Sequence, residues 1–224
     1  MSVLAIFPAR GGSKRIKNKN IIDFCGRKMI EYPITAAKHS NLFDEIHVST
    51  DSKIIGNVVQ RAGVKIEFFR PKHLSDDLTG TIPVLKWVLE KYKSIGKKFD
   101  DIFNIMPASP FLKKEDLVAA YNIYCSHDRK HPLHVVAEFP APIEWAFRRE
   151  NNGKLVPVNK GGYAIRSQDL QKAYYETGPF SIFHSSHILN KKPVTDEGFL
   201  SYVIPKDRAI DIDDHEDLKL AEKI

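Results

Sequence analysis

The chain has 224 residues, 42% of them hydrophobic, which is enough to build a full core in one domain. It carries 34 basic and 28 acidic residues, and the acids are spread along the chain, so we expect a local anion site rather than a basic surface. Two cysteines exclude a disulfide framework, and no apolar run approaches the roughly 20 residues of a membrane span. The first residues lack the pattern of a signal peptide, and we expect a cytoplasmic protein with no membrane partner.

Short β-branched runs alternate along the chain with segments of helical periodicity. The predicted strands are residues 3–7, 45–50, 64–69, 101–106, 133–139, 180–185 and 201–205. Apolar residues recur every three or four positions over 51–63, 81–92 and 117–124, which predicts helices between the strands. This order predicts an α/β fold with a mostly parallel sheet and helices on both faces.

Polar residues and glycines suggest where these helices begin and end. Asp51 is the candidate N-cap of the first helix, and Gly63 stands where its C-terminus favours glycine. Thr81 is the candidate cap of the next helix. The acids Asp214, Glu216 and Asp217 crowd the first turn of a predicted last helix, where the helix dipole favours negative charge.

The alternation of strands and helices stops after Phe139. The residues that follow are rich in Pro, Gly and Asn, with an apparent turn at 150–154, and they predict a hairpin or loop excursion. We therefore expect one domain over 1–224, with residues 140–180 as an inserted segment.

A basic loop with two adjacent glycines, residues 9–20 (ARGGSKRIKNKN), follows the first predicted strand. Gly11 and Gly12 allow the backbone to approach a ligand, and Arg10, Lys14 and Lys19 supply positive charge. In open α/β sheets, ligands bind beyond the carboxyl ends of the strands, where this loop lies. A polyphosphate is the favoured partner, although the loop has neither a Walker nor a G-x-G-x-x-G pattern. A solvated loop and a nucleic-acid patch are the alternatives, the latter disfavoured because no aromatic residues are interleaved.

An acidic pair near the end of the sequence could complement the basic loop. Asp211 and Asp213 alternate along a predicted extended segment, so both carboxylates point to one face. Two hard oxygen donors, completed by nucleotide phosphates, suit Mg²⁺. An acidic pair before a helix also serves as a cap or an exposed edge. The presence of a basic loop in the same chain favours a magnesium triphosphate site.

Six ordered motifs carry a family resemblance over nearly the whole chain: ARGGSKRIKNKN, VSTDS, RPKHLSDDLTGT, ASPF, RSQDL and DID..EDL. They resemble the CMP-N-acetylneuraminate synthetase family, and most of all its pseudaminic acid cytidylyltransferase branch. The resemblance implies a Rossmann-like fold of the nucleotide-diphospho-sugar transferase type. It also implies a Mg²⁺-dependent reaction in which CTP and a nine-carbon 2-keto sugar acid give a CMP-sugar and pyrophosphate, for surface glycan biosynthesis. A homodimer is implied, with residues 140–180 exchanged between subunits.

The resemblance further implies roles for individual residues. The implied nucleotide-binding residues are Ala9, Arg10, Gly11, Ser13, Lys14, Lys19, Asn20, Arg70, Thr79 and Thr81. The implied sugar-binding residues are Met106, Ser109, Arg166, Gln168 and Tyr174. The implied catalytic residues are Arg10, Lys14, Asp211 and Asp213, of which the two aspartates would hold the metal. Ordinary roles are also open for several of them: a surface ion pair for Arg70, a helix cap for Thr81, a loop cation for Arg166 and core packing for Tyr174.

Two positions depart from the family pattern near the implied sugar site. Met106 stands where the family often has glutamine, and the residues after Tyr174 differ from those expected of the pseudaminic acid branch, although Glu176 keeps an acid there. N-acetylneuraminic, legionaminic and Kdo-type acids are therefore alternative substrates. A non-catalytic module that binds nucleic acid through the basic residues 14–28 is the alternative of a different class, and the enzyme prediction implies no nucleic-acid partner.

Overall fold

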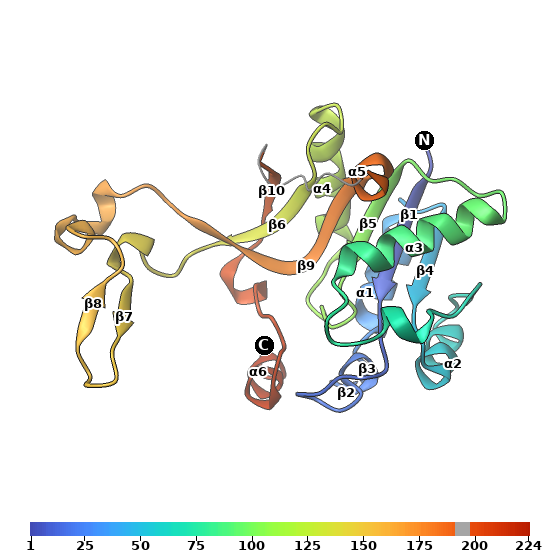
Figure 1. Cartoon of the computed structure of the whole chain (residues 1–224), viewed down its shortest axis with the longest axis horizontal. Coiled ribbons are helices and arrows are strands. Elements are labelled where there is room, and N and C mark those ends of the chain that lie inside the picture. Colours follow the sequence, from blue (N-terminus) through green and yellow to red (C-terminus); the bar gives the residue numbers. More distant parts are fainter. Residues whose placement is uncertain (191–197) are drawn as a thin grey trace.

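The computed structural model describes residues 1–190 and 198–224. The strands of its main sheet are β1 (Val3–Pro8), β4 (Glu45–Ser49), β5 (Asp101–Ile105), β6 (Leu133–Glu138), β9 (Tyr174–His184) and β10 (Leu200–Val203). They lie in the order β10-β6-β9-β5-β1-β4 (Figure 1). Only β9 is antiparallel to its neighbours, β5 and β6, among these strands. The prediction of a mostly parallel sheet is confirmed.

Helices cover both faces of this sheet, as predicted (Figure 1). The described helices are α1 (Glu31–Ser40), α2 (Lys53–Arg61), α3 (Thr81–Ser94), α4 (Lys114–Ser126), α5 (Ser185–Leu189) and α6 (His215–Ala221), the last of which packs against residues 16–29 rather than on the sheet. Helix α1 packs against α4, and α3 packs against α5. The longest of the described helices spans 14 residues, and none of them has the length and apolarity needed to cross a membrane.

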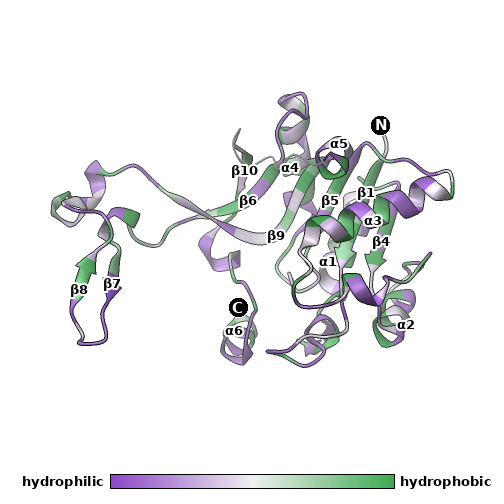
Figure 2. Ribbon diagram, viewed as in Figure 1, coloured by the Kyte–Doolittle hydropathy of each residue, from purple (hydrophilic) through white to green (hydrophobic). Residues whose placement is uncertain are grey.

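The alternation of side chains along β1 explains how one strand serves two cores. Val3, Ala5 and Phe7 pack into the cluster that includes α1, α2 and α4. Leu4 and Ile6 point to the other face and pack with residues of α3 and α5. Because successive side chains of a strand point to opposite faces, a central strand covered on both sides is apolar throughout. Figure 2 shows this apolar character in the central strands.

Four predicted strands correspond closely to β1, β4, β5 and β6, but the prediction for residues 64–69 is wrong. That segment has strand-like composition yet forms no ladder, and its end is joined to the neighbourhood of β4 through the bond from the Arg70 amide to the Thr50 carbonyl, 2.8 Å. Strand propensity alone does not supply a pairing partner. The strand predicted over 180–185 begins earlier, at Tyr174, and α1 was not predicted.

The structure corrects two predicted helix caps. The N-cap of α2 is Ser52, whose hydroxyl accepts a bond from the Ile55 amide. Helix α3 is capped by Gly80, and Thr81 is already its first helical residue. The prediction for the last helix is confirmed: Asp214 caps α6 and accepts bonds from the amides of Glu216 and Asp217.

Residues 140–173 form an arm that leaves the body between β6 and β9 (Figure 1). The arm carries a hairpin of β7 (Phe147–Arg149) and β8 (Leu155–Pro157), with the turn at 150–154 as predicted. The rest of the predicted insertion, residues 174–180, belongs to β9 of the main sheet. At the base of the arm the Phe139 amide donates to the Ala173 carbonyl, 2.9 Å, so its two ends lie side by side.

Candidate active site

A pocket of about 520 Å³ lies beyond the carboxyl ends of β1 and β5. It is formed by four stretches of chain, residues 8–20, 106–112, 177–180 and 204–213, together with Asp77 and Asp116. This is where ligands of open α/β sheets bind. The predicted basic loop and the predicted acidic pair therefore line the same cavity.

A small apolar cluster holds these two segments together. Ile16 of the basic loop and Phe24 pack with Ile212 and Leu218 of the C-terminal segment, and all four side chains are buried. Phe24 and the adjacent pair Cys25–Gly26 belong to a tight hairpin of β2 (Asp23–Phe24) and β3 (Arg27–Lys28). Burial of apolar surface thus joins regions about 200 residues apart in sequence.

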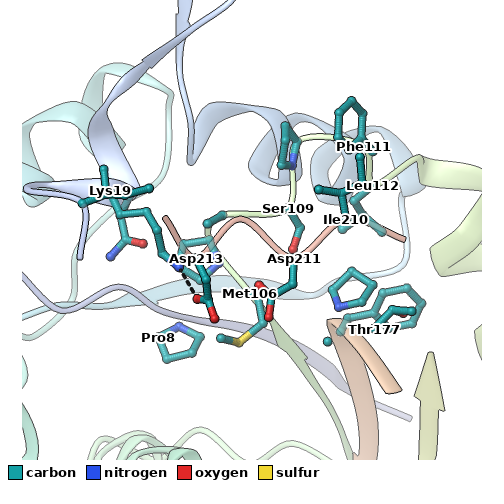
Figure 3. A pocket seen from close by; sticks show the side chains of 18 of the residues that line it. Pro8, Lys19, Met106, Ser109, Phe111, Leu112, Thr177, Ile210, Asp211 and Asp213 are labelled. Carbon is teal, nitrogen blue, oxygen red and sulfur yellow. Dashed lines mark hydrogen bonds and ion pairs between the residues drawn. The ribbon is translucent and has the colours of Figure 1, made fainter. Parts of the chain in front are cut away.

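Asp211 and Asp213 alternate with apolar neighbours along the C-terminal segment. Ile212 points into the apolar cluster, whereas the two carboxylates point into the pocket (Figure 3). The guanidinium of Arg15 donates to both oxygens of Asp213, at 2.8 and 2.7 Å. The ammonium of Lys19 donates to the Ile212 carbonyl at 2.7 Å and to Asp213 at 3.2 Å. The expectation that both aspartates share one face agrees with this geometry.

The electrostatics of the two aspartates differ. Partial desolvation of the Asp211 carboxylate, and then the negative charge of Asp213, raise the pKa of Asp211 above its usual value. The positive charges of Lys19 and Arg15 oppose this rise without cancelling it. The ionised form of Asp211 is thus only partly compensated by the nearby positive charges, and a bound cation would stabilise it.

Two further cations of the basic loop, Arg10 and Lys14, share a different acid. The guanidinium of Arg10 lies 2.7 Å from the carboxylate of Asp77 and donates to the Asp76 carbonyl at 2.6 Å. The ammonium of Lys14 pairs with the second oxygen of Asp77. Four of the five cations of the loop are therefore divided into two pairs, each held by one aspartate, and the fifth, Lys17, lies outside the pocket lining.

The backbone of the loop is fixed by its own polar contacts. The Gly11 amide donates to Asp51 at 2.9 Å, and a side chain at Gly11 would place its Cβ 3.0 Å from the Cβ of Ser52. The buried side chain of Asn20 donates to the Arg10 carbonyl at 3.1 Å. Glycine suits position 11 because any larger residue would press its Cβ against Ser52 at the start of α2.

Comparison with known proteins identifies the family. Residues 4–185 match the family model described as Cytidylyltransferase. The chain belongs to the cytidylyltransferase family. It is 36% identical to a pseudaminic acid cytidylyltransferase of Campylobacter jejuni, over 99% of this chain and 95% of that protein. It is 31% identical to a CMP-N,N'-diacetyllegionaminic acid synthase of the same species, over 98% and 93% of the two chains.

A solved structure shows the same fold. A CMP:2-keto-3-deoxy-manno-octonic acid synthetase in complex with CTP superposes with a TM-score of 0.71, covering 100% of this chain and 98% of that one at 14% identity. The predicted Rossmann-like fold is confirmed, and the prediction of an enzyme, a nucleotidyltransferase, is confirmed by the family.

The pocket of this cytidylyltransferase contains most of the predicted nucleotide and metal residues. Arg10, Ser13, Lys14, Lys19, Asn20, Asp211 and Asp213 all line it, and so do Met106 and Ser109 from the predicted sugar set (Figure 3). Ala9 is buried behind the loop, and its amide donates to the Ser49 carbonyl at 2.9 Å. The roles of these residues stay predictions, but their proximity is a feature of the fold.

Besides Ala9 and Gly11, three predicted nucleotide residues lie outside the pocket lining. Arg70 is buried and donates to the side chain and the carbonyl of Ser49, at 3.0 and 2.6 Å, instead of forming the alternative surface pair. Burial lowers the pKa of Arg70 to about 10, so it remains a cation at neutral pH. Thr79 and Thr81 lie on the segment that leads into α3, beyond Asp77.

The predicted sugar residues Arg166, Gln168 and Tyr174 do not reach the pocket either. Arg166 and Gln168 belong to the arm, where Arg166 pairs with Asp169 at 2.7 Å, and Tyr174 stands at the start of β9 with 46% of its surface exposed. The simple alternative of core packing for Tyr174 is wrong. Within one chain these residues therefore do not line the pocket that they were predicted to serve.

Sequence reasoning missed Arg208, which lines the pocket and binds the buried acid Asp116. Its guanidinium donates to both oxygens of Asp116, at 2.5 and 2.9 Å, and the Tyr202 hydroxyl adds a bond at 2.9 Å. Burial alone would raise the pKa of Asp116, but the bonds from Arg208, Lys113 and Tyr202 hold it below its usual range. The signal in the sequence was an arginine three residues before Asp211.

Proposed function

We propose that this cytidylyltransferase transfers CMP from CTP to pseudaminic acid, a nine-carbon 2-keto sugar acid, and releases pyrophosphate. The main observation in support is that four cations from residues 10–19 and the carboxylates of Asp211 and Asp213 line one pocket beyond β1 and β5. The relatives named above, which act on sugar acids, support this substrate class.

Charge explains how the pocket would promote the reaction. The hydroxyl on the anomeric carbon of the sugar acid attacks the α-phosphorus of CTP, and pyrophosphate leaves in line with growing negative charge. Arg10 and Lys14 would neutralise the leaving group, while Lys19 and Arg15 lie beside the acidic pair. Little covalent work is required of the protein, because positioning and charge stabilisation carry most of phosphoryl transfer.

The acidic pair has the chemistry of a magnesium site. Asp211 and Asp213 offer hard carboxylate oxygens, and the described residues contain no group of three or more His, Cys, Asp or Glu arranged to hold a metal ion. Mg²⁺ commonly takes one or two carboxylates and completes its shell with water and substrate phosphates, so the pair fits this ion. When bound, the metal would neutralise charge on the phosphates.

A homodimer would complete the site, because the arm carries the predicted sugar residues away from their own pocket. The arm also exposes apolar side chains beyond what its own hairpin buries, namely Phe147, Leu155, Val156, Val158, Tyr163 and Ile165 (Figure 2). An exposed apolar segment of this kind favours association. A second copy would bring Arg166 and Gln168 to the pocket of its partner.

Pyrophosphate release tests the proposal. With Mg²⁺ and pseudaminic acid present, we expect release from CTP and little from ATP, GTP or UTP. A panel of pseudaminic, N,N'-diacetyllegionaminic, N-acetylneuraminic and Kdo acids then measures kcat/KM for each sugar. Highest kcat/KM with another acid would replace the proposed substrate, and no release with any acid would contradict the reaction. Salt-sensitive RNA binding without release would support the basic module instead.

A further inference from the structure

Asp77 is a further acid that contacts the basic loop, in addition to the pair Asp211 and Asp213. Asp77 lines the pocket, and its two oxygens are taken by Arg10 and Lys14, one cation on each. The bonds from Lys14 and then Arg10 lower the pKa of Asp77, so this carboxylate is ionised at neutral pH. The protein itself therefore places an anion against the cations that the proposed function assigns to the phosphates of CTP.

The turn that carries Asp77 is ordered locally and packs little. The carboxylate of Asp76 accepts bonds from the amides of Leu78 and Thr79, at 3.0 and 2.7 Å, which fixes the turn in the manner of an Asx turn. The side chain of Leu78 is 94% exposed, so no buried apolar contact anchors the tip. Asp77 could move away from the cations with little loss of core packing.

We propose that Asp77 competes with substrate phosphates for Arg10 and Lys14, so that the loop stays closed to weakly bound small anions and opens to a polyphosphate with further contacts in the pocket. The inference rests on the proposed phosphate role of the loop. A small anion that replaces Asp77 exchanges one ion pair for another and gains little. A triphosphate or pyrophosphate is longer and also reaches Arg15 and Lys19, which line the same pocket. These additional contacts offset the cost of displacing Asp77.

The opposite role would be for Asp77 to orient the two cations for the substrate. The two roles predict opposite signs for one substitution. If Asp77 competes, Asp77→Asn tightens the binding of anions, because the side chain keeps its size and loses its charge. If Asp77 orients Arg10 and Lys14, the same substitution weakens binding.

The experiment compares wild type, Asp77→Asn and the matched control Asp128→Asn. Asp128 is an exposed acid after the C-terminus of α4, paired with Lys130 at 3.3 Å, and its backbone has a positive φ of 55° that asparagine tolerates. The dissociation constants of pyrophosphate and of orthophosphate are measured by calorimetry. For Asp77→Asn we expect about three- to tenfold tighter binding of pyrophosphate, the range of one or two exposed ion pairs, and a similar gain for orthophosphate. Asp128→Asn should bind both as wild type does.

Two further results separate this inference from the proposed function. Unchanged or weaker anion binding by a folded Asp77→Asn protein, with a wild-type circular dichroism spectrum, overturns the competition. Binding of pyrophosphate by Lys14→Ala tests the loop itself. If Lys14→Ala weakens pyrophosphate binding while Asp77→Asn does not tighten it, only the role of Asp77 fails. If Lys14→Ala has no effect, the phosphate role of the loop fails with it.

Discussion

At the scale of single residues, the exposed cation Lys14 is the sharpest test of the basic loop. Among the described residues its side chain pairs with Asp77 alone, so its removal costs the fold little. Loss of one preorganised contact to a charged transition state costs about 10²- to 10³-fold in rate. We expect Lys14→Ala to lower kcat by that order at an unchanged melting temperature. The control is Lys17→Ala, an exposed lysine outside the pocket lining, and equal rates for both variants would contradict the assignment.

Removal of the Asp211 charge should stabilise the metal-free protein. Because its folded-state pKa is raised, the ionised carboxylate destabilises the metal-free fold, and this cost appears as the pH rises through that pKa. Asp211→Asn should therefore raise the melting temperature of the metal-free protein at pH 7, and the gain should vanish in acid. It should also remove most activity and the binding of Mn²⁺ as a probe for Mg²⁺.

The neighbouring aspartate is the control for this effect. Asp213→Asn loses its bonds to Arg15 and Lys19, so we expect no stabilisation there. Thermal scans in EDTA, at pH 7 and at pH 4, measure the difference. Equal stabilisation by both substitutions would contradict the special position of Asp211.

At the scale of elements, Arg208 ties the segment after β10 to the N-terminus of α4. Its partner Asp116 is buried and also accepts a bond from the Lys113 amide, 3.0 Å, at the start of that helix. Removing one partner of a buried pair commonly costs about 3–5 kcal/mol. Since Arg208 keeps some solvent contact, we expect Arg208→Ala to lower the free energy of unfolding by about 3 kcal/mol, measured in urea. A cost below about 1 kcal/mol would show that the pair is not structural.

The sequence predicted elements well where local pattern and pairing agree. Strand β1 is apolar throughout because both of its faces are covered, and α6 has its acids at the cap. Residues 64–69 have the same composition as a strand but lack a partner, which no local pattern reveals. The site was predicted through charge type, whereas Arg208 and Asp77 were missed because their roles depend on contacts 92 and 67 residues away in sequence.

At the scale of the whole molecule, the arm can be removed without cutting the sheet. Its ends meet at the bond between Phe139 and Ala173, so a short glycine linker can replace residues 140–173. We expect this variant to keep its far-ultraviolet circular dichroism and its binding of CTP, to sediment as a monomer, and to lose turnover with the sugar acid. A dimer that persists without the arm would move the interface elsewhere.

The bidentate contact between Arg15 and Asp213 joins residues 198 positions apart. During translation at about 5–20 residues per second, the basic loop emerges roughly 10–40 seconds before the acid that meets it. On the growing polypeptide, the pocket therefore stays incomplete until residue 213 has been made. Nascent chains interrupted before that point would carry the cationic side of the pocket without its acidic side.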